Sequence, residues 1–250
     1  MSGHSKWSSI KHKKGAADKK RGQLFSKLSR AIIVAAREGG GDPSGNLALQ
    51  NAVEKARSYS MPKDNIERAI ARGSGADSDA ASYETVVYEG YGAGGVAILV
   101  EALTDNRNRT ASEVRAAFGK YDGNLGASGA VAWQFDRRGM VLVDGSADED
   151  ELTLAAADGG ADDVQQDGSS WQVTAAPEAL MGVREAIEAA GFAVDSAELT
   201  MVPKTTVEVD DEGTAKKILR LIDALEENDD VQDVYSNFDI PERVLETVAG

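Results

Sequence analysis

Apolar positions in the first third of the chain repeat with the period of an α-helix. The pattern predicts a helix that starts at Gln23 and ends at the glycines of 39–41. Its apolar face consists of Leu24, Phe25, Leu28, Ile32 and Ala35. "GNLALQNAVEKARSYS" and "MPKDNIERAIARGSG" have the same period, and the second places Pro62 in its first turn and Gly73 at its C-terminal cap. We predict a three-helix domain over residues 1–75, followed by the polar linker "GSGADSDAAS".

Beyond the linker the pattern changes to that of strands. "YETVVYEGYGAGGVAILVEAL" predicts a hairpin, and "TASEVRAAFGKY" predicts a helix that begins with Thr110 and Glu113 at capping-box spacing. Further on, the pattern predicts a βαββαβ unit of the ferredoxin-like type. Its elements are a strand at 140–143, a helix at 150–157, strands at 162–166 and 171–174, a helix at 177–190 and a strand at 193–202.

The last third predicts a further βαβ piece, made of the strand "KTTVEV", the helix "AKKILRLIDALEEN" and the strand "VQDVYSNF". This piece has too few strands to fold alone, and so has the hairpin with its helix at 83–120. We therefore expect residues 80–132 and 204–240 to form one α/β domain, with residues 135–202 inserted as a ferredoxin-like domain. The fold class is α+β: an N-terminal three-helix domain followed by two α/β domains, the last inserted into the middle one.

Charge is divided unevenly along these 250 residues, whose formal net charge is −15. Residues 1–73 carry 15 Lys and Arg against 6 Asp and Glu, a net charge of +9, and the remainder carries 12 against 36, a net charge of −24. A basic end on an acidic body attracts and orients a polyanion. The alternative is a solvated helical domain that is merely rich in lysine.

The basic residues cluster in the segment before the first helix and along the polar face of that helix. Spaced ammonium groups in a polar segment suit a phosphate backbone rather than the reading of bases. Trp7 either stacks on an unpaired base or anchors the segment on the helices. The candidate nucleic-acid-binding residues are Lys6, Trp7, Lys11, His12, Lys13, Lys14, Lys19, Lys20, Arg21, Lys27, Arg30 and Arg37.

A second candidate is a phosphate site in "TDNRNRTASE". Arg107 and Arg109 precede the predicted helix N-terminus at Thr110, where free N–H groups favour anions. Alternatively, these arginines pair with Asp105 or with other acidic residues and order the loop.

The sequence gives little support for a metal site, a nucleotide site or a catalytic site. The chain has no cysteine and only two histidines, His4 and His12, so we expect neither a metal site nor a cofactor. The stretch 90–95 satisfies G-x-G-x-x-G but leads into a predicted strand, which favours a glycine-rich hairpin over the dinucleotide fingerprint. The acidic clusters predict helix caps and solvated faces rather than catalytic pairs. No apolar run approaches the length of a membrane span and no signal peptide is evident, so a cytoplasmic location without membrane contact is expected.

Several motifs together resemble the YebC family nearly end to end: "SGHSKW", "KHKK", "DKKRG", "REGGGDP", "MPKDNIERAI", "EGYGAGGVA", "TDNRNRT", "GNLGASGAV" and "DVQDVYSNFDI". The family includes mitochondrial translational activators. The resemblance implies the same three-domain architecture and a non-enzymatic regulator of gene expression, acting on transcription or translation. Ala93 departs from the family, in which proline is common at this position.

We therefore expect a non-enzymatic regulator whose basic N-terminal domain binds an RNA or DNA backbone, with the ribosome as the implied partner and the acidic body free to bind proteins. The alternatives are a DNA-binding transcriptional regulator, a metal-dependent nuclease that uses the carboxylates, and a protein-binding scaffold.

Overall fold

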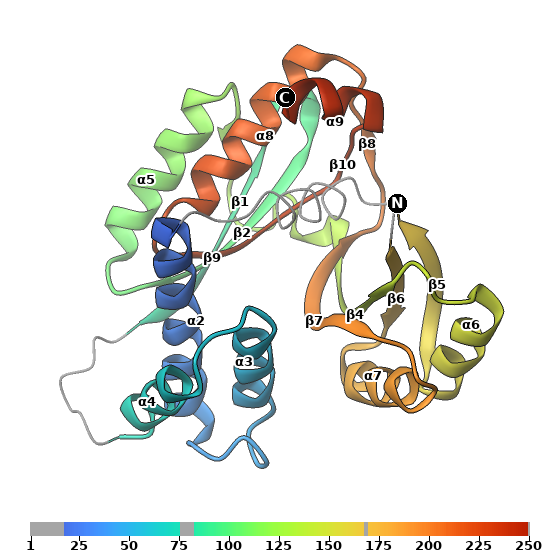
Figure 1. Cartoon of the computed structure of the whole chain (residues 1–250). Helices are drawn as coiled ribbons and strands as arrows, with labels where there is room; N and C mark the ends of the chain where they lie inside the picture. Colours follow the sequence, from blue (N-terminus) through green and yellow to red (C-terminus); the bar gives the residue numbers. More distant parts are fainter. Residues whose placement is uncertain (1–17, 76–82, 168–169, 250) are drawn as a thin grey trace.

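The computed structural model describes residues 18–75, 83–167 and 170–249, which form an α+β protein of helices followed by two four-stranded sheets with their own helices and one two-stranded sheet (Figure 1). This confirms the predicted fold class. No helix within these residues is long and apolar enough to cross a membrane.

The helical unit contains α2 (Asp18–Gly39), α3 (Leu47–Ser58) and α4 (Lys63–Gly73). Helix α2 begins before the predicted Gln23, and Pro62 directly precedes α4 rather than lying within its first turn. A Cβ on Gly73 would lie 2.4 Å from the carbonyl oxygen of Ile33, so α2 and α4 approach too closely for any side chain there. The buried core includes Leu28, Ile32, Ile33, Ala36, Leu49, Val53, Ala56, Ile66 and Ala69.

The first sheet has the order β3-β1-β2-β9. Its strands are β1 (Glu84–Tyr91), β2 (Ala97–Thr104), β3 (Asn124–Leu125) and β9 (Val231–Ser236). One face packs on α5 (Arg107–Lys120) and α8 (Glu212–Glu226), and α9 (Glu242–Ala249) adjoins α8 (Figure 1). Strands β1 and β2 form the predicted hairpin, in which Gly94 and Gly95 adopt positive φ angles of 70° and 79°. The glycine-rich stretch is thus a hairpin connection and not a nucleotide loop.

Two predicted elements of this unit were wrong in detail. The segment "KTTVEV" does not join the four-stranded sheet. Instead β8 (Val207–Glu208) pairs in parallel with β10 (Phe238–Asp239). Helix α5 begins at Arg107 rather than Thr110, because the side chain of Asn106 accepts a hydrogen bond from the N–H of Arg109 and caps the helix earlier.

The second sheet lies between these halves in sequence and has the order β5-β6-β4-β7, with every neighbouring pair antiparallel. Its strands are β4 (Phe135–Asp144), β5 (Ala161–Asp167), β6 (Ser170–Ala175) and β7 (Val194–Pro203). Helices α6 (Glu149–Asp158) and α7 (Leu180–Ala189) pack on it around Leu152, Val183 and Ile187. Short 3₁₀ turns at Ala93–Gly95, Ala132–Gln134 and Pro177–Ala179 complete the structure. This strand order is that of the predicted ferredoxin-like unit.

Candidate nucleic-acid interface

Many of the predicted binding residues belong to the segment that precedes the described structure. Lys6, Trp7, Lys11, His12, Lys13 and Lys14 lie outside the described residues, and with them the choice between two roles for Trp7. Lys19 and Lys20 lie in the first turn of α2, but their side chains also fall outside the description. Of the predicted interface, the side chains from Arg21 onward belong to the described structure.

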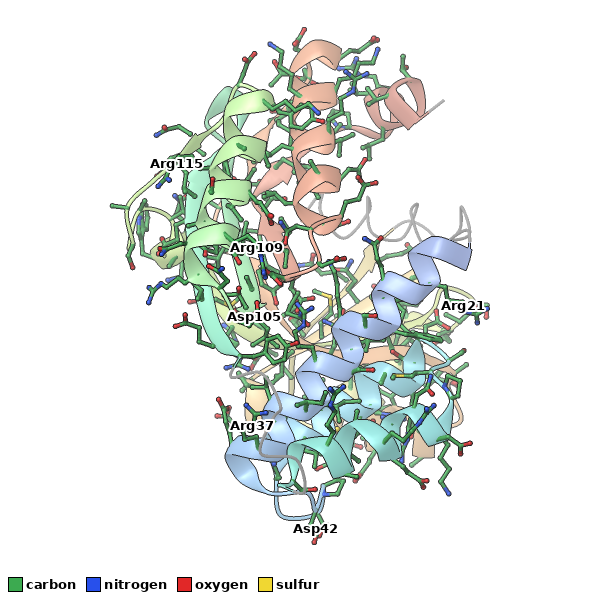
Figure 2. All side chains as sticks on the ribbon, turned by 90° about the vertical axis from the view of Figure 1, so that its left-hand side faces the viewer. Arg21, Arg37, Asp42, Asp105, Arg109 and Arg115 are labelled. Carbon is green, nitrogen blue, oxygen red and sulfur yellow. The ribbon has the colours of Figure 1, made fainter. Side chains whose placement is uncertain are left out.

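The predicted binding residues of α2 whose side chains are described separate into two groups. Arg21 and Arg37 are exposed near opposite ends of the helix (Figure 2), and the Arg21 guanidinium lies 5.8 Å from the centre of the Phe25 ring. Lys27 and Arg30, between them, face the first sheet instead of solvent. Among the cations of α2 whose side chains are described, the exposed ones thus lie near the two ends of the helix.

Lys27 is held against the C-terminal end of α8. Its Nζ donates a hydrogen bond of 2.6 Å to the carbonyl oxygen of Glu226. Burial of the ammonium group lowers the pKa of Lys27 from 10.5 to about 8, although the nearby charges of Glu226, Asp233 and Asp229 act in the opposite direction. In this structure Lys27 therefore joins α2 to the sheet unit, and its predicted role as a phosphate contact stays a prediction.

Arg30 makes more contacts with the sheet unit than Lys27 does. Its Nη1 donates to the carbonyl oxygens of Leu103 at 3.2 Å and Asp229 at 2.8 Å, and lies 3.1 Å from Oδ1 of Asp230. The guanidinium also lies 4.9 Å from the centre of the Tyr83 ring. With a side chain only 17% exposed, Arg30 joins α2 to the sheet and cannot reach a phosphate backbone without breaking these contacts.

The second candidate site is organised around the same buried carboxylate. Oδ2 of Asp230 accepts hydrogen bonds of 2.7 Å from Nη2 of Arg109 and 2.7 Å from Oγ1 of Thr110. Nη2 of Arg109 also lies 2.9 Å from Asp105. Burial would raise the pKa of Asp230, but the hydrogen bonds from Arg109 and Thr110, with the charges of Arg109 and Arg30, hold it below its usual value.

The geometry therefore fits the alternative in which Arg109 pairs with carboxylates and orders the loop. Arg107 is different, because its side chain is 67% exposed and lies 3.8 Å from Glu84. The two arginines lie within the first turn of α5 rather than ahead of it, and they do not converge on one site.

Exposed cations on α3 and α4 were not among the predicted residues. They are Arg57, Lys63, Arg68 and Arg72. The last turns of α2 and α4, which carry Arg37 and Arg72, lie side by side because Gly73 packs against Ala36. The sequence signal for the cations of α4 was the strongly amphipathic pattern of the segment at 63–73, whose buried face includes Ile66 and Ala69.

No group of three or more His, Asp and Glu side chains among residues 18–75, 83–167 and 170–249 is placed to hold a metal ion. In two acidic clusters, at 148–151 and 209–213, a carboxylate serves as a helix cap: Asp148 accepts from the N–H groups of Asp150 and Glu151, and Asp211 from that of Thr214. These contacts are the ones expected of helix N-termini.

Known proteins similar to this chain cover nearly all of it. Residues 5–76 match the family described as the TACO1/YebC protein N-terminal domain, and residues 83–238 match the TACO1/YebC second and third domain. A protein of Rubrobacter xylanophilus is 60% identical over 100% of both chains, and one of Geobacter sulfurreducens is 53% identical over 98% of this chain and 99% of its own. Each is named a probable transcriptional regulatory protein. The crystal structure of a conserved hypothetical protein from Aquifex aeolicus is 49% identical, with a TM-score of 0.80 over 89% of this chain and 92% of that chain.

Proposed function

Because the chain belongs to the TACO1/YebC family, we propose that it regulates gene expression by binding the phosphate backbone of a nucleic acid through residues 1–75. The proposed target is RNA of the translation machinery, and the ribosome is the proposed partner. We propose that the protein acts by binding this target and not by catalysing a reaction.

The separation of charge between residues 1–73 and the remainder is the observation that carries this proposal. A net charge of +9 in one part and −24 in the other attracts a polyanion to one end only. The contacts of Lys27 and Arg30 support it further, because they hold the basic helical unit in one orientation on the acidic sheet unit. We propose that the binding surface comprises the N-terminal segment from Lys6 to Arg21 and continues to Arg37.

Backbone contact is the expected mode of binding. Each lysine or arginine that neutralises a phosphate releases condensed counterions, so the affinity falls steeply with salt and depends little on sequence. The helical unit offers exposed side chains at the ends of α2 and on α4, spread over a surface rather than aligned on one helix that could enter a groove.

A titration of RNA against the full chain tests the proposal. Replacing Lys11, Lys13 and Lys14 by glutamine removes three predicted phosphate contacts, so the slope of log K against log salt should fall in magnitude by about 2. The matched control replaces Lys120, Lys204 and Lys216 of the acidic body by glutamine and should leave the slope unchanged. Salt-insensitive binding, or equal effects of both triple variants, would contradict the proposal. Intact regulation after loss of the three N-terminal lysines would instead indicate a protein-binding scaffold.

The alternative is a DNA-binding transcriptional regulator, which the names of the relatives favour. Matched RNA and duplex DNA, titrated at one salt concentration, separate the two possibilities. A strong preference for one duplex sequence would favour the alternative.

Sedimentation of a cell lysate tests the proposed partner directly. If the protein acts on translation, it travels with ribosomes at low salt and is released at high salt, because the contacts are electrostatic. Recovery away from ribosomes at both salt concentrations would contradict a ribosomal role.

A further inference from the structure

The outer edge of β1 is largely unpaired. Strand β1 pairs with β2 along its whole length, whereas β3 covers only Gly90 and Tyr91 on the other side. One further hydrogen bond, from the N–H of Gly126 to the carbonyl oxygen of Glu89, ends the pairing with that segment. Within the described parts of the chain, no strand covers the outer edge from Glu84 to Tyr88.

The groups that this edge presents follow from the strand's alternation. The carbonyl oxygen of Glu89 points outward to Gly126, so Thr85 and Val87, which have the same parity, also direct their N–H and C=O groups outward. The register with β2 agrees. Leu103, which lies opposite Thr85, donates its N–H to the carbonyl oxygen of Asp230 and therefore points away from β1. Val87 is 45% exposed. Two residues therefore offer both donors and acceptors to an additional strand.

A groove of about 280 Å³ lies along this edge, between β1 and α5. The loop after β3 closes one end, and Glu89 fixes that loop by accepting hydrogen bonds from the N–H groups of Gly129, Val131 and Ala132. The α5 side chains that line the groove belong to Arg107, Asn108, Ala111 and Arg115. A helix beside an open strand edge is the arrangement with which domains bind an extended peptide as an added strand.

The groove is positively charged although it belongs to the acidic part of the chain. Arg115 is exposed and has no partner among the described residues, and it lies on α5 away from Arg109, which faces Asp230 (Figure 2). Arg107 has only a long contact of 3.8 Å with Glu84. The Glu89 carboxylate keeps its negative charge, but it is directed at three amide N–H groups that partly screen it from an anion in the groove.

We propose that the outer edge of β1 binds an extended acidic segment of a partner protein as an additional strand of the first sheet. Arg107 and Arg115 are eight residues apart on α5, a rise of about 12 Å. Four residues of a strand span about 13 Å. The segment therefore carries acidic side chains at positions i and i+4, on the same face of the added strand.

The edge itself favours a peptide over a nucleic acid. Its outward C=O groups accept hydrogen bonds from peptide N–H groups but repel phosphate oxygens. A second peptide strand satisfies donors and acceptors alike.

The test uses the full chain and a fluorescent, end-blocked peptide of about ten residues in which glutamate and valine alternate. Its binding is followed by anisotropy. We expect saturable binding, at least tenfold weaker binding of the lysine–valine counterpart, and about two- to fivefold weaker binding after Arg115→Gln. Arg220→Gln, an exposed arginine of α8 outside the groove, is the matched control and should have no effect.

The backbone contribution is tested by two independent changes. Val87→Pro removes one outward N–H and leaves the pairing with β2 intact, so peptide binding should weaken by about tenfold, whereas Val87→Thr should bind normally. Methylating alternate amides of the peptide tests the same hydrogen bonds without altering the protein. Methylation of the amides that face β1 should abolish binding, whereas methylation of the alternate amides, which face away from β1, should not.

Four results would overturn the proposal. The first is no binding of the glutamate–valine peptide up to about 1 mM, and the second is equal binding of both methylated peptides. The third is a dimer of this chain that Val87→Pro dissociates, because the edge would then belong to a second copy. Loss of RNA binding after Arg115→Gln with no effect on the peptide would assign the groove to nucleic acid and would equally exclude a peptide.

Discussion

At the scale of single residues, Asp230 is the buried carboxylate that binds Arg30 of α2 where this helix contacts the first sheet. Its side chain is 6% exposed and meets Arg30, Arg109 and Thr110. Asp230→Asn removes the charge that both guanidinium groups require, so we expect the free energy of unfolding to fall by about 2–4 kcal/mol. Urea unfolding measures this change in the free energy of unfolding. Asp229→Asn, at an exposed neighbour, should change stability by less than about 0.5 kcal/mol, and similar losses for both variants would contradict the assigned role.

The lowered pKa of Lys27 predicts how the stability of the protein depends on pH. Its pKa is about 8 in the folded protein against 10.5 in the unfolded chain, so the unfolded state holds more protons between these values. The contribution of Lys27 to stability therefore rises with pH from about 8 to 10.5 and is constant below this window. Lys27→Met removes the ionisable group. We expect the stability of the unmodified protein to gain about 2 kcal/mol relative to this variant between pH 8 and 10.

Chemical denaturation across this pH window measures the difference. Lys63→Met is the control, because the Lys63 side chain is 85% exposed and should show no such trend. A difference between the unmodified protein and Lys27→Met that stays flat with pH would mean that the ammonium is not desolvated at the end of α8.

At the scale of elements, the crossing of α2 and α4 depends on Gly73. A Cβ there would lie 2.4 Å from the carbonyl oxygen of Ile33, so Gly73→Ala must push the helices apart and should destabilise the protein by about 1–3 kcal/mol. Gly22, in α2, has no atom within 4 Å of an added Cβ. Gly22→Ala should therefore stabilise by about 0.5–1 kcal/mol through helix propensity. Thermal unfolding of both variants checks the opposite signs, and a stabilising Gly73→Ala would refute the close crossing.

Local patterns predicted the order of helices and strands well but not the boundaries that distant residues decide. Thr110 and Glu113 have the spacing of a capping box, yet Asn106 caps α5 and the Thr110 hydroxyl is bonded to Asp230, 120 residues away in sequence. Similarly, "KTTVEV" has the composition of a sheet strand. In the structure, however, β8 pairs with Phe238 and Asp239 in a separate two-stranded sheet.

At the scale of the whole molecule, the charge separation could be calculated from the sequence, but the cations that remain exposed could not. Helical periodicity placed Lys27 and Arg30 opposite the helical core and therefore predicted a solvent-facing stripe. In the structure a second partner, the segment around 226–230, occupies that face. A helix with two buried faces has the same periodicity as one with a polar exposed face when the second contact is made by charged side chains.

Polar contacts also fix the helical unit to the rest of the molecule through α3. Lys55 lies 2.7 Å from Asp233 of β9 and 3.7 Å from Glu198 of β7, and Glu54 pairs with Arg184 of α7. One face of α3 therefore joins elements of both sheets.

The combined change of Lys55 and Arg184 to methionine leaves these carboxylates unpaired and should loosen the helical unit as a whole. We expect the protection of α2–α4 amides against hydrogen exchange to fall by about 2 kcal/mol, while the amides of β1, β2 and β4 keep theirs. The matched control changes Arg138 and Lys204 to methionine, because these residues pair within the second sheet unit, with Asp162 and Asp136. Equal protection of α3 in both double variants would show that apolar packing alone holds the helices in place. A selective loss would show that the orientation of the basic unit on the acidic body depends on charge and therefore weakens as salt rises.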